Sequence, residues 1–273
     1  LRMPMSPTES TYHALLNEAD FTCQMLGSGA TQIGRASYAS KGIYFQAFSS
    51  LSTGLERLGK LCLMLDHFHE HGRFPDLPYM RREIGHHIVT IHARTEAIVS
   101  GRGMRLRHLQ VLTDPVHLSI IELLSAFAVG DRYSNIDLVV GKAASGDPIG
   151  RWFSRVDNPL FADRVTDYKK AQILHNAQLA EHVLGSMSAV FYTTETGDSI
   201  QTLRDASIRT GVQKAVAPYR QLYVLQVIRY WVDVLWALER IAWNPAIPGF
   251  GEIFARFNNT DSIFRGRTTW ERD

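Results

Sequence analysis

Two arginines and two histidines lie close together in the sequence RREIGHHI, residues 81–88, and their side chains suit chemistry on a phosphate. An imidazole that titrates near neutral pH can take a proton from a hydroxyl or give one to a leaving oxygen. A guanidinium group can hold a phosphate and stabilise the charge that grows on it. Arg81, Arg82, His86 and His87 are therefore the candidate catalytic residues.

The spacing of these residues limits how one helix can present them. The two members of an Arg-x4-His pair on a straight α-helix point about 140° apart. A helix irregularity near Gly85, or a second copy of the chain, would be needed to bring them to one phosphate. Glu56 and Lys60 are four residues apart on the preceding segment, which suits either a supporting role beside the site or an ordinary surface ion pair.

The elements that would position these side chains are helices. Apolar residues recur at steps of three and four along most of the chain, and alternating strand patterns are almost absent from the sequence. Asp114 before Pro115 is typical of a helix start, and Pro218 is predicted to open the last long helix. The predicted helices span 11–26, 35–71, 80–100, 115–128, 161–192 and 218–243.

These helices predict an all-α fold, a helical bundle formed by a single domain over residues 1–273. Its core is expected at about 35–140, with a helical extension at about 145–245 packed around it and an irregular tail at 246–273. The glycines of GSGATQIG, residues 27–34, are expected to form a turn that ends the first helix. They lack the preceding strand and the Lys-Ser/Thr ending of a phosphate-binding loop.

Composition bears on the kind of partner and on the cellular compartment of the protein. A formal net charge of +2 argues against a generally basic coat for nucleic acid, although 23 of the 29 basic residues are arginine, the cation that best suits phosphates. Cys23 and Cys62 lie in apolar helical patterns, which favours a reducing compartment. The sequence shows no signal-peptide pattern, and the apolar segment 219–243 carries too many charges for a membrane span. We therefore expect a soluble cytoplasmic protein that does not contact a membrane.

The run FQAFSSLSTGLERLGKLCLML, residues 45–65, followed by RREIGHHI, resembles the HEPN superfamily of helical-bundle proteins. The signature of that family is an Arg, four to six further residues and a His. It is met here by Arg81 with His86, by Arg82 with His87 and by Arg81 with His87. The run RYSNID, residues 132–137, is also similar to a segment that follows the bundle in some larger members, so the resemblance covers about 35–140.

This resemblance implies a metal-independent ribonuclease, often a toxin or an effector of antiviral defence, whose active site forms where two protomers meet. It implies RNA as the substrate, a homodimer, no cofactor, and a protein antitoxin or regulator as a further partner. His86 or His87 would then act as acid or base, and Arg81 or Arg82 would clamp the phosphate. Cleavage by the ribose 2′-hydroxyl needs no metal-bound water.

Two other functions are compatible with the same sequence. A non-catalytic helical module would use the bundle surface to bind a protein or a nucleotide-bearing partner. In DHFHEHGR, residues 66–73, His67 and His71 are four apart and can share a zinc ion, but the absence of evident further ligands favours a solvated helix end. Trp231 and Trp236 are expected to pack in the core rather than to stack on bases.

Overall fold

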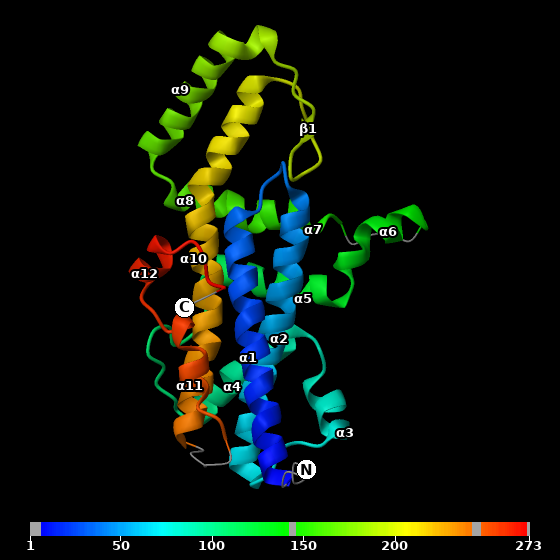
Figure 1. Ribbon diagram of the computed structural model, residues 1–273, viewed down its shortest axis with the longest axis vertical. Coiled ribbons are helices and arrows are strands. Elements are labelled where there is room, and N and C mark those ends of the chain that lie inside the picture. The colour runs from blue at the N-terminus through cyan, green and yellow to red at the C-terminus, as the bar shows by residue number, and fades with distance from the viewer. Residues whose placement is uncertain (1–6, 142–145, 242–246, 272–273) are drawn as a thin grey trace, which may run out of the picture.

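Three long helices form the axis of the molecule. The computed structural model describes residues 7–141, 146–241 and 247–271. Its longest elements are α1 (Pro7–Arg35), α2 (Lys41–His71) and α10 (Leu203–Ile241). Figure 1 shows α1 and α2 as an antiparallel pair with α10 alongside, and the predicted all-α bundle is confirmed. Over the described ranges, none of the helices combines the length and the apolar character that crossing a bilayer requires.

Shorter helices complete the bundle and extend it. α4 (Ile88–Gly101) and α5 (Pro115–Val129) pack against α2. The Asp114 side chain accepts a hydrogen bond from the backbone N–H of Val116 at 2.9 Å, which confirms the predicted start of α5. The remaining elements are α3 (Leu77–Tyr79), α6 (Ser134–Val139), α7 (Pro148–Trp152), α8 (Asn158–Arg164), α9 (Asp167–Leu184), β1 (Tyr192–Thr193), β2 (Ser199–Ile200), α11 (Phe250–Ile253) and α12 (Asp261–Gly266).

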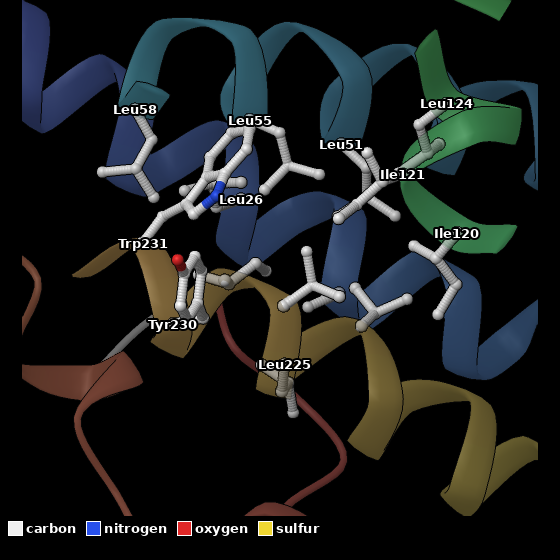
Figure 2. Packing of buried hydrophobic residues seen from close by; sticks show 14 of the residues in the cluster. Leu26, Leu51, Leu55, Leu58, Ile120, Ile121, Leu124, Leu225, Tyr230 and Trp231 are labelled. Carbon is white, nitrogen blue, oxygen red and sulfur yellow. The ribbon is translucent and has the colours of Figure 1, made fainter. Parts of the chain in front are cut away.

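One apolar core joins α1, α2, α4, α5 and α10 with the short helices α7, α8, α11 and α12. Figure 2 shows side chains of α1, α2, α5 and α10 meeting within it, among them Leu26, Leu55, Ile121 and Trp231. The C-terminal segment adds buried aromatic side chains, namely Phe250, Phe254, Phe257, Phe264 and Trp270. The segment predicted as an irregular tail therefore holds α11 and α12 in its described residues and packs against α1 and α10.

The glycine-rich segment 27–34 continues α1, so the predicted turn is wrong. A Cβ atom at Gly27 would lie 2.2 Å from the carbonyl oxygen of Trp270, and one at Gly29 would lie 2.6 Å from Leu51. These glycines let neighbouring elements approach α1 more closely than any side chain would allow. The packing gained there outweighs the roughly 1 kcal/mol of helix propensity that each glycine loses relative to alanine.

α10 passes through Pro218, so the prediction that this proline opens the helix is wrong. A proline inside a helix removes one backbone hydrogen bond and costs about 3 kcal/mol. Val216 and Arg220, on either side of it, are both buried and hold this part of α10 against its neighbours. Figure 1 shows α10 changing direction along its length, as expected for a helix that contains a proline.

The single helix predicted over 161–192 is divided into α8 and α9. Val165 is extended between them, and the Thr166 hydroxyl accepts a hydrogen bond from the backbone N–H of Lys169, which caps α9. α9 packs against α10, and Figure 1 shows α9 and the first turns of α10 standing beyond the rest of the bundle. A turn at Gly197, where φ is +92°, links β1 and β2.

Candidate catalytic site on the α2–α4 face

The segment RREIGHHI does not form one helix. Its two arginines lie in a π-helical turn, Met80–Ile84, which ends at Gly85. Gly85 has φ +63° and ψ −150°, a backbone conformation that is strained for any other residue. After His87, which is extended, α4 begins at Ile88. The prediction of a continuous helix over 80–100 is therefore wrong. The helix is interrupted at Gly85, near which the spacing of arginine and histidine had suggested an irregularity.

Two isoleucines fix this connection to the core. Ile84 is 3% exposed and Ile88 is fully buried, so the chain is held on both sides of Gly85. Because both anchors point inward, the residues between them turn outward, and His86 and His87 are exposed. The glycine and the two apolar anchors together determine where the histidines lie.

Glu56, Lys60 and His86 form a contiguous polar cluster. One carboxylate oxygen, Glu56 Oε1, lies 2.7 Å from Lys60 Nζ and 2.8 Å from His86 Nδ1. The Glu56 and Lys60 side chains are each 19% exposed, whereas that of His86 is 78% exposed. The cluster thus has a partly buried base on α2 and an imidazole that faces solvent.

The hydrogen bonding of this cluster sets the roles of the two imidazole nitrogens. Lys60 Nζ lies 3.3 Å from His86 Nδ1, and an ammonium group can only donate. The shorter contact is with Glu56, so we assign the Nδ1–H of His86 as donating to the carboxylate. This arrangement leaves Nε2 of His86 open to solvent, where it can take a proton from a substrate.

Arg81, Arg82 and His87 do not join this cluster in a single chain. All three are exposed, and none of their side chains makes a hydrogen bond or an ion pair with another residue in the part of the chain that the structure describes. The two guanidinium groups are therefore available to a phosphate from solution. The structure brings together Glu56, Lys60 and His86 and leaves the two arginines apart from them.

A pocket of about 440 Å³ opens beside the cluster, between α1, α2 and the segment that precedes the π-helical turn. Lys60 belongs to its lining, as do Glu18 and Arg57, which form an ion pair at 2.8 Å. The apolar part of the lining comes from Ala14, Leu15, Leu61, Met64, Phe74 and Met80. A ligand bound at His86 therefore has room for an apolar or ring-shaped group next to Lys60.

His67 and His71, considered as zinc ligands, are engaged elsewhere. Their rings stack at 4.2 Å, and the Nδ1 atoms lie 3.0 Å from the carbonyl oxygen of Arg73 and 3.1 Å from that of His67, respectively. Among the described residues, no group of three or more histidine, cysteine, aspartate or glutamate side chains is arranged to hold a metal ion. Trp231 is buried, as predicted, and donates a hydrogen bond to His92, whereas Trp236 is partly exposed.

Sequence reasoning missed a second group of basic residues. Arg105 and Arg107, just after α4, and Arg240, near the end of α10, line one pocket together. The sequence signal was the pair of arginines at alternate positions in MRLRHL, residues 104–109. The contribution of α10 lies too far away in sequence for a local pattern to reveal it.

Comparison of the chain with protein-family models, with curated proteins and with solved structures found no match in any of the three. The fold and the site therefore have to be interpreted from their own geometry. Two observations bear most directly on function, namely the solvent-facing imidazole of His86 held by Glu56 and the unpaired arginines that precede it.

Proposed function

We propose that the protein is a metal-independent endoribonuclease that acts as a homodimer, as the resemblance to the HEPN superfamily implies. The observation that carries the proposal is the contact of Glu56 Oε1 with both Lys60 Nζ and His86 Nδ1. A carboxylate that orients an imidazole and leaves its other nitrogen exposed is the arrangement that general acid–base catalysis needs. Arg81 and Arg82 supply unpaired guanidinium groups for the phosphate.

The reaction is an internal transfer at phosphorus. The ribose 2′-hydroxyl oxygen attacks the adjacent phosphorus, the bond to the 5′-oxygen breaks, and a 2′,3′-cyclic phosphate and a 5′-hydroxyl are formed. Nε2 of His86 takes the proton of the attacking hydroxyl, and a second histidine gives a proton to the leaving oxygen. The positive charges of Lys60 and of the arginines stabilise the extra negative charge on the phosphate oxygens.

A second protomer gives the arginines a role that one chain does not provide. Arg81 and Arg82 are exposed and separate from the Glu56–Lys60–His86 cluster. If two chains pack with their α2–α4 faces together, the arginines of one can meet the histidine of the other at one phosphate. The second histidine of the reaction, His87 or a histidine of the other protomer, would come from the same interface.

The test is cleavage of a mixed RNA by the purified chain in the presence of a chelator. We expect cleavage with 2′,3′-cyclic phosphate ends, and a loss of about 100-fold or more in His86→Ala, the usual contribution of a general acid or base. His175→Ala, which removes an exposed histidine on α9, is the matched control and should keep full activity. RNA that stays intact with the wild-type chain, or cleavage that His86→Ala does not reduce, would contradict the proposal.

The dimeric site is tested by mixing two inactive variants. Sites that combine arginines of one chain with the histidine of its partner would regain about a quarter of wild-type activity when Arg81→Gln/Arg82→Gln is mixed with His86→Ala after exchange of subunits. Half of the dimers would then be mixed, and each would hold one intact site. No recovery, with both variants dimeric, would show that each site belongs to one chain.

A non-catalytic interaction module is the second candidate, and α6 favours it. Figure 1 shows α6 standing away from the bundle. Its apolar side chains are largely exposed, with values of 61% at Ile136, 70% at Leu138 and 86% at Val139. Exposed apolar patches of this kind mark surfaces for protein partners. An intact RNA in the cleavage test would leave this function as the better explanation of the fold.

A further inference from the structure

A second pocket lies near the C-terminal end of α10. It has a volume of about 610 Å³ and is formed by the segment after α4 together with the last turns of α10. Its size is within the range of about 300–1,000 Å³ that small-molecule sites occupy. Neither the candidate catalytic residues nor the pocket beside Lys60 contributes to it.

Three arginines line this pocket. Arg105, Arg107 and Arg240 form no ion pair within the described residues, and Arg107 makes only a long contact of 3.5 Å with the side-chain oxygen of Asn258. Other arginines of the bundle are paired, as Arg102 is with Asp66, whereas Arg81 and Arg82 are not. Three unpaired guanidinium groups at one pocket attract an anion, and they outweigh the half negative charge at the end of α10.

The same pocket offers a flat surface for a ring. The guanidinium carbon of Arg240 lies 5.5 Å from the ring centre of Trp236, and both side chains belong to the lining. Indole and guanidinium planes are the surfaces on which nucleobases stack in proteins that bind single nucleotides or single strands. Leu106 adds an apolar contact at the same pocket.

Two acidic groups limit where the anion can lie. Glu239 interacts electrostatically with its neighbour Arg240 but does not line this pocket. Asp233 lines the pocket, and one of its carboxylate oxygens accepts hydrogen bonds from the backbone N–H of His108 at 3.1 Å and from His108 Nδ1 at 3.0 Å. The Asp233 side chain is 1% exposed and is held by His108. A phosphate would therefore be placed toward the arginines, and the neutral part of the ligand toward Asp233.

We propose that this pocket binds a nucleoside monophosphate, with the phosphate held by Arg105, Arg107 and Arg240 and the base stacked on the Trp236–Arg240 pair. The combination of an unpaired cationic lining with an aromatic stacking surface is what selects this ligand class. The site is distinct from the ribonuclease site and does not depend on RNA cleavage.

The experiment is a calorimetric titration of the full chain with adenosine, guanosine, cytidine and uridine monophosphates at about 0.05 M and 0.15 M salt, where screening differs. The four nucleosides and inorganic phosphate serve as comparison ligands. We expect at least one monophosphate to bind, with weaker binding at the higher salt concentration. We expect its nucleoside and inorganic phosphate to bind about tenfold or more weakly, since each lacks one half of the contacts.

Variants then place the site. Arg105→Gln and Arg240→Gln should each weaken binding of the monophosphate about tenfold or more, because each removes a charged hydrogen-bond donor. Arg204→Gln is the matched control, since it removes an exposed arginine at the other end of the same helix, and it should bind as wild type does. His86→Ala should also bind as wild type does, so failure here and failure of the ribonuclease proposal are separate results.

Several outcomes would overturn the proposal. One is the absence of binding by any monophosphate, and another is unchanged binding in Arg105→Gln and Arg240→Gln. Inorganic phosphate binding as tightly as the nucleotides would show a plain anion site. Loss of binding in His86→Ala with retention in Arg240→Gln would place the nucleotide at the catalytic cluster instead. Melting curves of all variants confirm that each is folded, since the replaced side chains are exposed or at the pocket surface.

Discussion

Two clusters in this bundle combine a carboxylate, a cation and a ring, but they differ in burial. In the first, Arg220 Nη1 donates hydrogen bonds to Tyr44 Oη and to Asp157 Oδ2, each at 2.8 Å, and Arg220 Nη2 donates to the carbonyl oxygen of Ala36 at 2.9 Å. Arg220 is fully buried, and burial raises the pKa of Asp157 although Arg220 opposes that shift. This cluster joins α10 to α2 and to the segment that leads into α8.

The second cluster, Glu56–Lys60–His86, has similar groups at the surface. Its carboxylate is partly buried on α2, and its imidazole is 78% exposed. In the first cluster the buried atoms have no access to a substrate, so its interactions act on the free energy of folding. In the second an exposed nitrogen remains, so its interactions are available to a reaction. The two clusters contain similar residue types. What separates the structural cluster from the candidate catalytic one is whether a substrate can reach it from solvent.

The largest effect is expected from breaking the buried cluster. Asp157→Ala leaves the Arg220 guanidinium buried without a counter-charge, which should lower the free energy of unfolding by about 3–5 kcal/mol. The measurement is urea denaturation followed by circular dichroism. Glu18→Ala is the control, because it breaks a half-exposed pair with Arg57 and should cost less than about 1 kcal/mol.

If Asp157→Ala does not fold, a double variant tests the same expectation. The double replacement Asp157→Leu/Arg220→Met removes both charges and should be more stable than Asp157→Ala alone, because no buried charge is left unpaired. Equal losses in Asp157→Ala and Glu18→Ala would show that burial does not distinguish the two kinds of ion pair in this fold.

The next effect concerns a buried histidine, His92. Burial lowers the pKa of His92 to about 4, and its Nδ1 accepts a hydrogen bond from Trp231 Nε1 at 3.2 Å. The unfolded chain binds a proton at His92 near pH 6.5 and the folded chain does not, so this contribution to stability is complete above pH 6.5 and is lost as the pH falls toward 4. Between pH 7.5 and pH 5 the loss from His92 should be about 2 kcal/mol.

The measurement compares urea denaturation at these two pH values in wild type and in His92→Asn. His92→Asn retains an acceptor for Trp231 and should lose about 2 kcal/mol less than wild type between the two pH values. Burial also lowers the pKa of His117, so a smaller pH dependence should remain in this variant. The same pH dependence in both chains would contradict the lowered pKa of His92.

Much of the fold could be predicted from local patterns, and the helix ends that were predicted wrongly share one physical cause. The stripe from Phe45 to Leu65 predicted α2 well, and Asp114 with Pro115 marked the start of α5. Gly27 and Pro218 were interpreted as helix ends because local propensity disfavours both residues inside a helix. In the structure, contacts with Trp270 and the buried face of α10 outweigh that propensity. Such contacts join residues far apart in sequence, and no local pattern reveals them.

The candidate site was predictable in its parts but not in its assembly. The pairing of Glu56 with Lys60 follows from their spacing on one helix. The contact between Glu56 and His86 does not, since it depends on how the chain turns at Gly85 and how α2 and α4 pack. Ribonuclease activity, the family resemblance and the homodimer remain predictions, whereas the placement of these side chains is now described.

The smallest effect on stability should accompany a clear effect on catalysis, and Glu56→Gln separates the two. This variant keeps the size of the side chain but removes the charge that orients His86 and pairs with Lys60. The free energy of unfolding should fall by less than about 1 kcal/mol, as for other partly exposed pairs. The kcat for RNA cleavage should fall about tenfold with KM unchanged, because a better-held imidazole acts in the transition state and not in substrate binding.

A rise in KM with unchanged kcat would instead assign Glu56 to binding. An unchanged kcat and KM would mean that this carboxylate is only a surface ion-pair partner. The two clusters would then differ in burial, but neither would act in catalysis.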